Sequence, residues 1–160
     1  RSKFDTSAIS ELSTAQIVAM GSAQFAALTA AQLKALSTAQ LVVIDTVDVA
    51  ALTTAQIAAL SSSAVAALTD TSTGQVAALT SAQAAALSSA AVSGLSTAQI
   101  ARLSSAQLNA LSATQLNAMS SAQLRAIETA DVAALTTAQI VKFDTSAISE
   151  LSTAQIVAMG

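Results

Sequence analysis

Residues 12–20 read LSTAQIVAM, and related eight-residue phrases fill almost the whole chain. If the large apolar residue before each Ser or Thr is called position 1, this position recurs every eight residues on both sides of one interruption. The consensus is L-[ST]-[ST]-A-Q-[ILV]-x-A, and a strict short period of this kind indicates stacked repeats. Position 1 is occupied by Phe4, Leu12, Met20, Leu28, Leu36, Ile44, Leu52, Leu60, Leu68, Leu79, Leu87, Leu95, Leu103, Leu111, Met119, Ile127, Leu135, Phe143, Leu151 and Met159.

Position 2 indicates that a helix begins in every octad. It is Ser, Thr, Asp or Gly throughout, apart from Glu128, and these four residue types are preferred helix N-caps. Three residues later most octads carry Gln, which is the spacing of a capping box. Positions 1 and 6, such as Leu12 and Ile17, have the spacing of a hydrophobic staple. One local mechanism therefore accounts for four of the eight positions, and it predicts one short helix per octad.

Two other folds fit the pattern less well. In one continuous helix, eight residues advance about 80° beyond two full turns, so an apolar stripe would move around the axis and no partner could bury it. A β-solenoid would need alternating apolar positions, and Ala and Gln favour helix over strand. Because a helix of about six residues is unstable alone, the units must stack. The sequence predicts an all-α solenoid, a superhelix of short capped helices.

The period breaks once, in an eleven-residue unit at 68–78. We interpret residues 69–71, TDT, as an insertion in a surface loop, after which Ser72 and Gln75 restart a capping box. Asp70 offers a carboxylate to a cation, but one carboxylate is too few for Ca²⁺.

Residues 3–21 are identical to residues 142–160, at an offset of 139 residues. This identity suggests that residues 3–141, sixteen octads plus the eleven-residue unit, form one module and that residues 142–160 begin the next. An engineered duplication would produce the same pattern. Residues 1–2 differ from the two residues before the second copy and resemble a cloning scar. Stacked in pairs at about 9–10 Å per layer, seventeen helices would span on the order of 80 Å.

Composition argues against most kinds of active or binding site. The chain has no His, Cys, Tyr or Trp, and a Ser nucleophile would find only Lys3, Lys34, Lys142 or scattered carboxylates as its base. The net charge is −3 without a basic patch, so nucleic acid is not an expected partner. No run approaches the roughly 20 apolar residues of a membrane span, so membrane insertion is not expected either. The sequence predicts no enzyme, no catalytic or metal-binding residue and no cofactor.

The strongest polar candidates have structural explanations. Asp45 with Asp48, and Glu128 with Asp131, occupy positions 2 and 5, so we interpret each pair as a capping box. The regular hydroxyls of positions 2 and 3 resemble an ice-binding array, but Ser and Thr interchange freely there, whereas a lattice-matching face should favour Thr methyls. The basic residues that remain are interpreted as solvated, and they are Lys34, Arg102, Arg125 and Lys142.

Octads of the LSTAQIAA type resemble those of very large surface or secreted proteins of Gram-negative bacteria, which are often labelled adhesins or haem-utilisation proteins. The resemblance covers the whole chain. It implies a structural repeat module of a long extracellular or cell-surface protein, acting as stalk, spacer or fibre segment. The alternative it implies is an adhesive module that binds through one face of the superhelix. The haem label does not transfer, because no His, Cys or Tyr could ligate iron and only Met20, Met119 and Met159 carry sulfur.

Neighbouring copies of the same module are the expected partners. Solenoid ends expose apolar surface unless they are capped, so we expect end-to-end self-association of a fragment that begins and ends within such an array. The ligand at the distal end of a longer parent protein is not indicated by these residues.

Overall fold

The computed structural model describes residues 5–160, and it folds them into nineteen short α-helices without a strand in that range. One helix per octad, as predicted, is therefore confirmed. Residues 1–4, which include the suggested cloning scar and Lys3, lie outside the described residues. The helices are α1 (Thr6–Ser10), α2 (Thr14–Val18), α3 (Ser22–Ala27), α4 (Ala30–Lys34), α5 (Thr38–Leu41), α6 (Thr46–Ala51), α7 (Thr54–Ala58), α8 (Ser62–Ala66), α9 (Gln75–Ala78), α10 (Ser81–Ala86), α11 (Ser89–Ser93), α12 (Thr97–Ile100), α13 (Ser105–Ala110), α14 (Ala113–Asn117), α15 (Ser121–Ala126), α16 (Thr129–Ala133), α17 (Thr137–Ile140), α18 (Thr145–Glu150) and α19 (Thr153–Ala158).

The predicted caps set where the helices begin. In α2, the Ser13 hydroxyl accepts from the Gln16 amide at 3.2 Å, and Gln16 Oε1 accepts from the Ser13 amide at 2.8 Å. Between α3 and α4 the chain turns through two extended residues, Leu28 (φ −65°, ψ 142°) and Thr29 (φ −70°, ψ 157°). No described residue has a positive φ. The turns therefore need neither Gly nor Pro, which explains why the chain has four Gly and no Pro.

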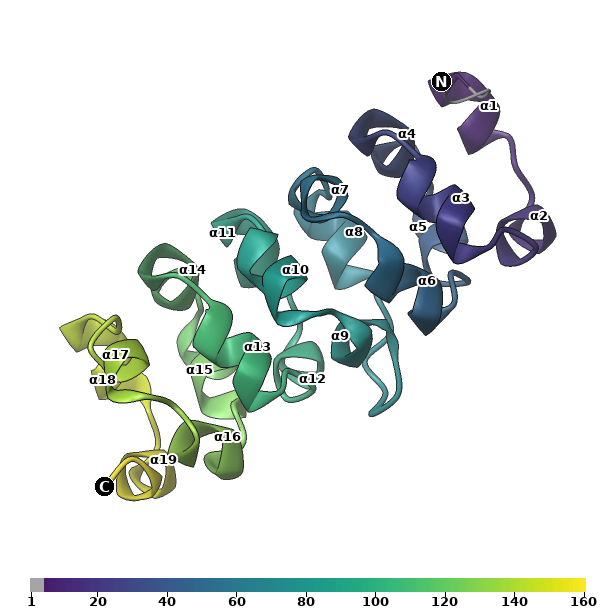
Figure 1. The fold of residues 1–160 in the computed structure, drawn as a ribbon. Helices are drawn as coiled ribbons and strands as arrows, with labels where there is room; N and C mark the ends of the chain where they lie inside the picture. The colour runs from purple at the N-terminus through teal and green to yellow at the C-terminus, as the bar shows by residue number, and fades with distance from the viewer. Residues whose placement is uncertain (1–4) are drawn as a thin grey trace.

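The helices stack with three to each turn of the superhelix, here called a coil. Helix α1 packs on α4, α2 on α5 and α3 on α6, and the same interval of three helices relates every well-packed pair along the chain. The assumption of stacking in pairs is therefore wrong, because each two-residue junction turns the chain by about a third of a turn on average and not by half. At about 9–10 Å per coil, seventeen helices span on the order of 50 Å instead of 80 Å. Figure 1 shows an elongated stack with the two termini at opposite ends.

The interior is a single apolar column. Positions 1 and 6 supply it, as Ile57 (1% exposed) and Leu60 (5% exposed) illustrate, and the buried apolar residues from Ile9 to Leu151 form one continuous cluster. Each coil thus buries its apolar residues against the coils before and after it. This arrangement is the nearest-neighbour stabilisation expected of a solenoid.

The insertion lies at a different point from the one that the sequence predicts. The Thr69 hydroxyl accepts from the Gln75 amide at 2.8 Å, and Gln75 Oε1 accepts from the Thr69 amide at 3.2 Å, so Thr69 and not Ser72 completes the cap. The three extra residues loop out between cap and helix, and the loop before α9 projects from the side of the stack (Figure 1). Gly74 is required there by close approach, since a Cβ would lie 2.9 Å from the Thr69 carbonyl oxygen.

The position-5 glutamines join successive coils. From Gln40 onward they are buried, with Nε2 directed at main-chain carbonyls of the preceding coil and with Oε1 accepting from the position-2 amide of their own repeat, except that Gln139 Oε1 accepts from Lys142 Nζ. Gln107 Nε2, for example, donates to Val76 O at 3.1 Å and to Leu79 O at 2.7 Å. We call this arrangement a glutamine bridge. It is made by Gln40, Gln56, Gln75, Gln83, Gln99, Gln107, Gln115, Gln123, Gln139 and Gln155.

Replacing the amide donor of a central bridge should destabilise the stack. We expect Gln107→Ala to lower the free energy of unfolding by about 2–4 kcal/mol, because two buried carbonyls and the Ser104 amide lose a partner. Gln107→Glu keeps the cap acceptor but places a carboxylate oxygen against those carbonyls. At pH 7 it should therefore lower the free energy of unfolding more than Gln107→Ala does. Below about pH 4 the introduced carboxyl is protonated and can donate, and the extra cost should disappear.

Urea unfolding at both pH values measures these effects. Gln16→Glu is the matched control, because Gln16 makes the same capping box but its Nε2 has no acceptor among the described residues. If the two substitutions at Gln107 lower the free energy of unfolding equally at pH 7, the glutamine bridge is contradicted.

Candidate functional site

The two carboxylate pairs singled out in the sequence are separate structural contacts. Asp45 accepts from the Val47 amide at 3.1 Å, and Asp48, which is 8% exposed, accepts instead from the Ser22 hydroxyl of the preceding coil. The side chain of Glu128 makes no cap hydrogen bond. The predicted capping boxes at these pairs are therefore wrong. An Asp side chain is one methylene shorter than Gln, and Asp48 at position 5 bonds to the coil below instead of to its own N-cap.

The electrostatics of the carboxylates follow from the same contacts. Burial, with repulsion from Glu128 as a smaller cause, raises the pKa of Asp131 above its ordinary value. At the N-caps of α1 and α18, hydrogen bonds from Ser7 and Ser146 lower the pKa values of Asp5 and Asp144. The contribution of these two caps to stability is thus present above the ordinary pKa of Asp and is lost as the pH falls below it. Asp5 and Asp144 thus serve helix ends, as Asp48 serves a neighbouring coil.

The basic side chains also bond to the scaffold. Arg102 Nε donates to the Asp70 carbonyl at 3.0 Å, and Arg125 donates to the Glu150 carbonyl at 2.8 Å and pairs with its carboxylate at 3.1 Å. Lys142 Nζ donates to Leu111 O at 3.2 Å. Their interpretation as merely solvated residues is therefore incomplete. Among the Lys and Arg side chains of residues 5–160, Lys34 alone is exposed without such a bond. Where these contacts are exposed, each contributes little to the free energy of unfolding.

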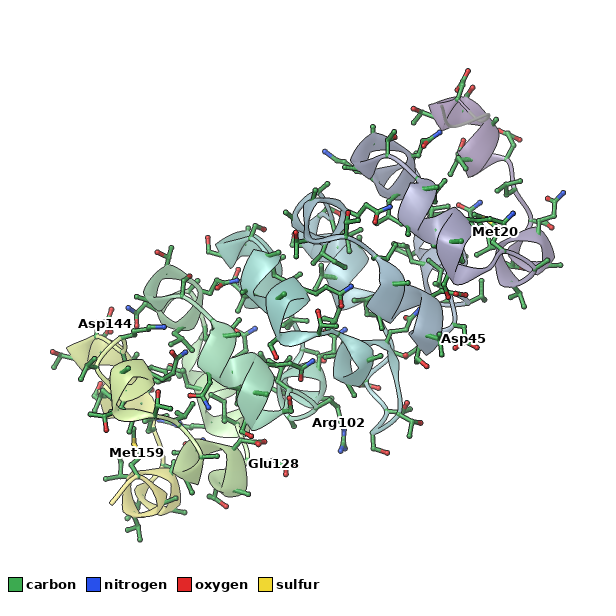
Figure 2. The ribbon with its side chains drawn as sticks, in the orientation of Figure 1. Met20, Asp45, Arg102, Glu128, Asp144 and Met159 are labelled. Carbon is green, nitrogen blue, oxygen red and sulfur yellow. The ribbon has the colours of Figure 1, made fainter. Side chains whose placement is uncertain are left out.

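The labelled residues of Figure 2 are spread along the stack and do not converge. Met20 and Met159 lie at opposite ends, and Asp45, Arg102 and Glu128 lie on separate coils. Within residues 5–160, no group of three or more acidic side chains is placed to hold a metal ion. Among the same residues, none of the helices is both long and apolar enough to cross a bilayer. The position-2 hydroxyls proposed for an ice-binding array mostly accept N–H groups in caps, such as Gln40 N to Ser37 Oγ at 3.2 Å.

Two asparagines that the sequence analysis missed make the most specific polar contacts outside the bridges. Asn117 Nδ2 donates to Lys142 O at 3.1 Å, and its Oδ1 accepts from the Asp144 amide at 3.0 Å. Asn109 contacts Ala134 O and the Thr136 amide in the same way. Each asparagine thus closes a helix junction in the following coil. Their spacing of eight residues, with Asn in two successive octads at position 7, was the available signal.

A shallow pocket lies where one bridge is missing. Helix α18 carries Ala147 in place of Gln, and a pocket of about 260 Å³ opens between it and α14–α15. Its lining includes Asn117, Met119, Leu124 and Ala147. The pocket is small, open and without a convergent set of charged groups, so we assign it to the absent glutamine and not to a ligand.

Comparison with known families then agrees with this geometry. The ALTTAQ repeat family matches at residues 41–71, 72–105, 92–126 and 124–160. Together these matches cover residues 41–160, which is three quarters of the chain. The chain belongs to the ALTTAQ repeat family. The last three ALTTAQ matches overlap one another in sequence, as expected when a smaller unit, the octad, is the structural repeat. No curated protein and no solved structure matches the chain.

The missing bridge of this ALTTAQ repeat chain can be restored. Ala147→Gln should stabilise the stack by about 1 kcal/mol, since the pocket can accept the side chain and the carbonyls 31 and 28 residues earlier, of Leu116 and Met119, lie in bridge register.

Ala91→Gln is the matched control. Ala91 is fully buried, and Gly94, the C-cap of the same helix, approaches Ser62 so closely that an added Cβ would lie 2.9 Å from the Ser62 Cβ. Because the coils are already in contact there, the longer side chain should lower the free energy of unfolding by about 1–3 kcal/mol. Thermal or urea unfolding compares the two variants. If both substitutions raise the free energy of unfolding, or both lower it, our account of the pocket is contradicted.

Proposed function

We propose that this chain is a structural repeat module of a long extracellular or cell-surface bacterial protein, in which it acts as a stalk, spacer or fibre segment. The observation that supports this best is the uninterrupted stack: one apolar column joins all coils, and the termini lie at opposite ends (Figure 1). A chain built in this way separates whatever is attached to its two ends by a fixed distance.

The polar side chains support a mechanical role over an enzymatic one. The hydroxyls, amides and carboxylates at positions 2 and 5 bond to helix ends or to neighbouring coils. No buried side-chain nitrogen or oxygen among the described residues is left without a partner. We therefore propose that the module is not an enzyme and carries no cofactor of its own.

The lateral surface offers little to a specific ligand. The large apolar residues exposed there are few and aliphatic, as Val42, Val47 and Val141 are. Phe25 and Phe143 are both in the core. Binding hot spots are usually built around clustered aromatic or Arg anchors. An adhesive role through one face of the superhelix is accordingly the second candidate, and it is tested below.

The length of tandem copies tests the spacer directly. Chains with one, two and three copies of residues 3–141 keep the octad register, because residues 142–160 repeat residues 3–21. We expect each added copy to lengthen the particle by about 50 Å in small-angle scattering, from five to six coils of about 9–10 Å.

The same chains distinguish the adhesive alternative. Saturable binding of a single copy to cells, glycans or a matrix protein, with a raised melting temperature, would favour adhesion over the spacer. A particle whose longest dimension does not grow with copy number would contradict the stacked rod.

A further inference from the structure

We propose that the loop at residues 70–74 is a site at which an endoprotease cuts the folded chain, and that the cut chain remains one intact stack. The protease hydrolyses the peptide bond between Thr71 and Ser72. Water supplies an OH group to the Thr71 carbonyl carbon and a proton to the Ser72 nitrogen, so the products are a new carboxylate and a new ammonium group. Because only the stack and its loop are involved, this cleavage does not depend on the spacer function.

The loop is the longest irregular segment between two helices of the described chain. Helix α8 ends at Ala66 and α9 begins at Gln75, and no other pair of successive helices within residues 5–160 is so far apart in sequence. Residues 70–73 are all exposed, and the loop projects from the side of the stack (Figure 1). Exposed loop tips of small polar residues are the preferred sites of proteolytic nicking.

Few contacts hold the tip of the loop. The Gly74 amide donates to the Thr71 carbonyl at 2.9 Å, and Arg102 Nε donates to the Asp70 carbonyl at 3.0 Å. Within the part of the chain that the structure describes, residues 70–73 make no other hydrogen bond. The tip can therefore open without the loss of a cap or a glutamine bridge. Cleavage of a folded chain requires such local opening, so a segment that opens easily is cut first.

The ordinary two-residue junctions are better protected, as Leu79–Thr80 illustrates. Leu79 is 4% exposed, and its carbonyl accepts from Gln107 Nε2 at 2.7 Å. The Thr80 amide donates to Gln83 Oε1 at 2.8 Å. Opening this junction breaks a capping box and a bridge and exposes a core residue. We therefore expect cleavage at the loop well before cleavage at a junction of this kind.

A single cap closes the base of the loop and lies outside the segment that is cut. The Thr69 hydroxyl accepts from the Gln75 amide at 2.8 Å, and the Val76 amide donates to the Thr69 carbonyl at 3.2 Å. Thr69 stays with the N-terminal fragment, whereas Gln75 and Val76 stay with the C-terminal fragment. These hydrogen bonds consequently join the two fragments after the cut.

The two fragments also share a complete coil junction. Helix α9 packs on α6, α10 on α7 and α11 on α8, so three helices of each fragment meet. Three glutamine bridges cross from the C-terminal to the N-terminal fragment, from Gln75 to Ile44 O at 2.9 Å, from Gln83 to Leu52 O at 2.7 Å and from Gln99 to Leu68 O at 2.8 Å. The apolar column continues across the same junction. Fragments 1–71 and 72–160 should thus remain associated.

The stack itself does not need the tip of the loop. Deleting residues 70–72 leaves the octad LTTGQVAA, which differs from the consensus only by Gly74 in place of Ala at position 4. Thr69 and Gln75 are then three residues apart, which is the ordinary spacing of a capping box. The deletion variant should therefore keep the stack and lose the cleavage site.

Limited digestion of the folded full chain with proteinase K tests the site. Mass spectrometry should identify the first cut that yields two large fragments within residues 70–73. The fragments should elute together in size-exclusion chromatography, at the volume of the uncut chain, and should separate only in urea. The deletion variant, compared at equal stability in urea, should be cut at least about tenfold more slowly.

Two arginine variants test the role of the contact that holds the loop. Arg102→Ala removes the donor to the Asp70 carbonyl and should speed the cut about twofold, since an exposed contact of this kind contributes little. Arg125→Ala is the matched control, because Arg125 makes a similar exposed contact with Glu150 on a distant coil. It should leave the rate of the loop cut unchanged.

Each remaining outcome would overturn part of the proposal. A first cut at a two-residue junction, or a deletion variant that is cut as fast as the original chain, would show that the loop is not the site. Fragments that separate without urea would show that the cut takes the stack apart.

Discussion

The structure depends on one side-chain amide that closes two helix ends at once. A chain that restarts a helix every eight residues leaves unpaired N–H and C=O groups at every junction, and a buried junction cannot leave them to water. The position-5 glutamine solves both halves of this problem. Gln115 Oε1 accepts from the Ser112 amide at 2.7 Å, and its Nε2 donates to Leu87 O, also at 2.7 Å. The cap of one helix is therefore also the hydrogen bond that holds the next coil in place.

Because this junction is local and repeated, the sequence of an octad does not determine on which side of the superhelix it lies. The identical pairs α1–α2 and α18–α19 occupy different sides of the superhelix, since they are seventeen helices apart and seventeen is not a multiple of three. The three sides are thus interchangeable. If residues 3–141 recur in tandem, a lateral feature such as the loop at 70–74 would move to another side in each copy. Such a chain is better suited to setting a length than to presenting one continuous binding face.

Local patterns predicted the local structure well. Caps and staples fixed the helix starts, the all-α class and the apolar positions of the core, because these depend on neighbours within an octad. The number of helices per coil depends on the turn angle at junctions such as Leu28–Thr29, which capping rules do not specify. The second partner of each glutamine lies 28–34 residues away and was missed for the same reason. A signal for it existed: a capping box accepts Glu as readily as Gln, but no octad has Glu at position 5.

The octads without a bridge show that the coils can be joined in a second way. Helices α8 and α11 stack on each other, and both carry Ala at position 5, Ala64 and Ala91. Gly94, at the end of α11, lies so close to α8 that the Ser62 carbonyl oxygen would be 3.3 Å from an added Cβ. Small residues there bring the backbones together, so dispersion contacts replace the hydrogen bonds of a glutamine. At α18, Ala147 lacks such a close neighbour, and a pocket remains together with the Asn117 contact to the Asp144 amide. The absence of a glutamine is thus tolerated where the coils approach closely or where another amide supplies the missing acceptor.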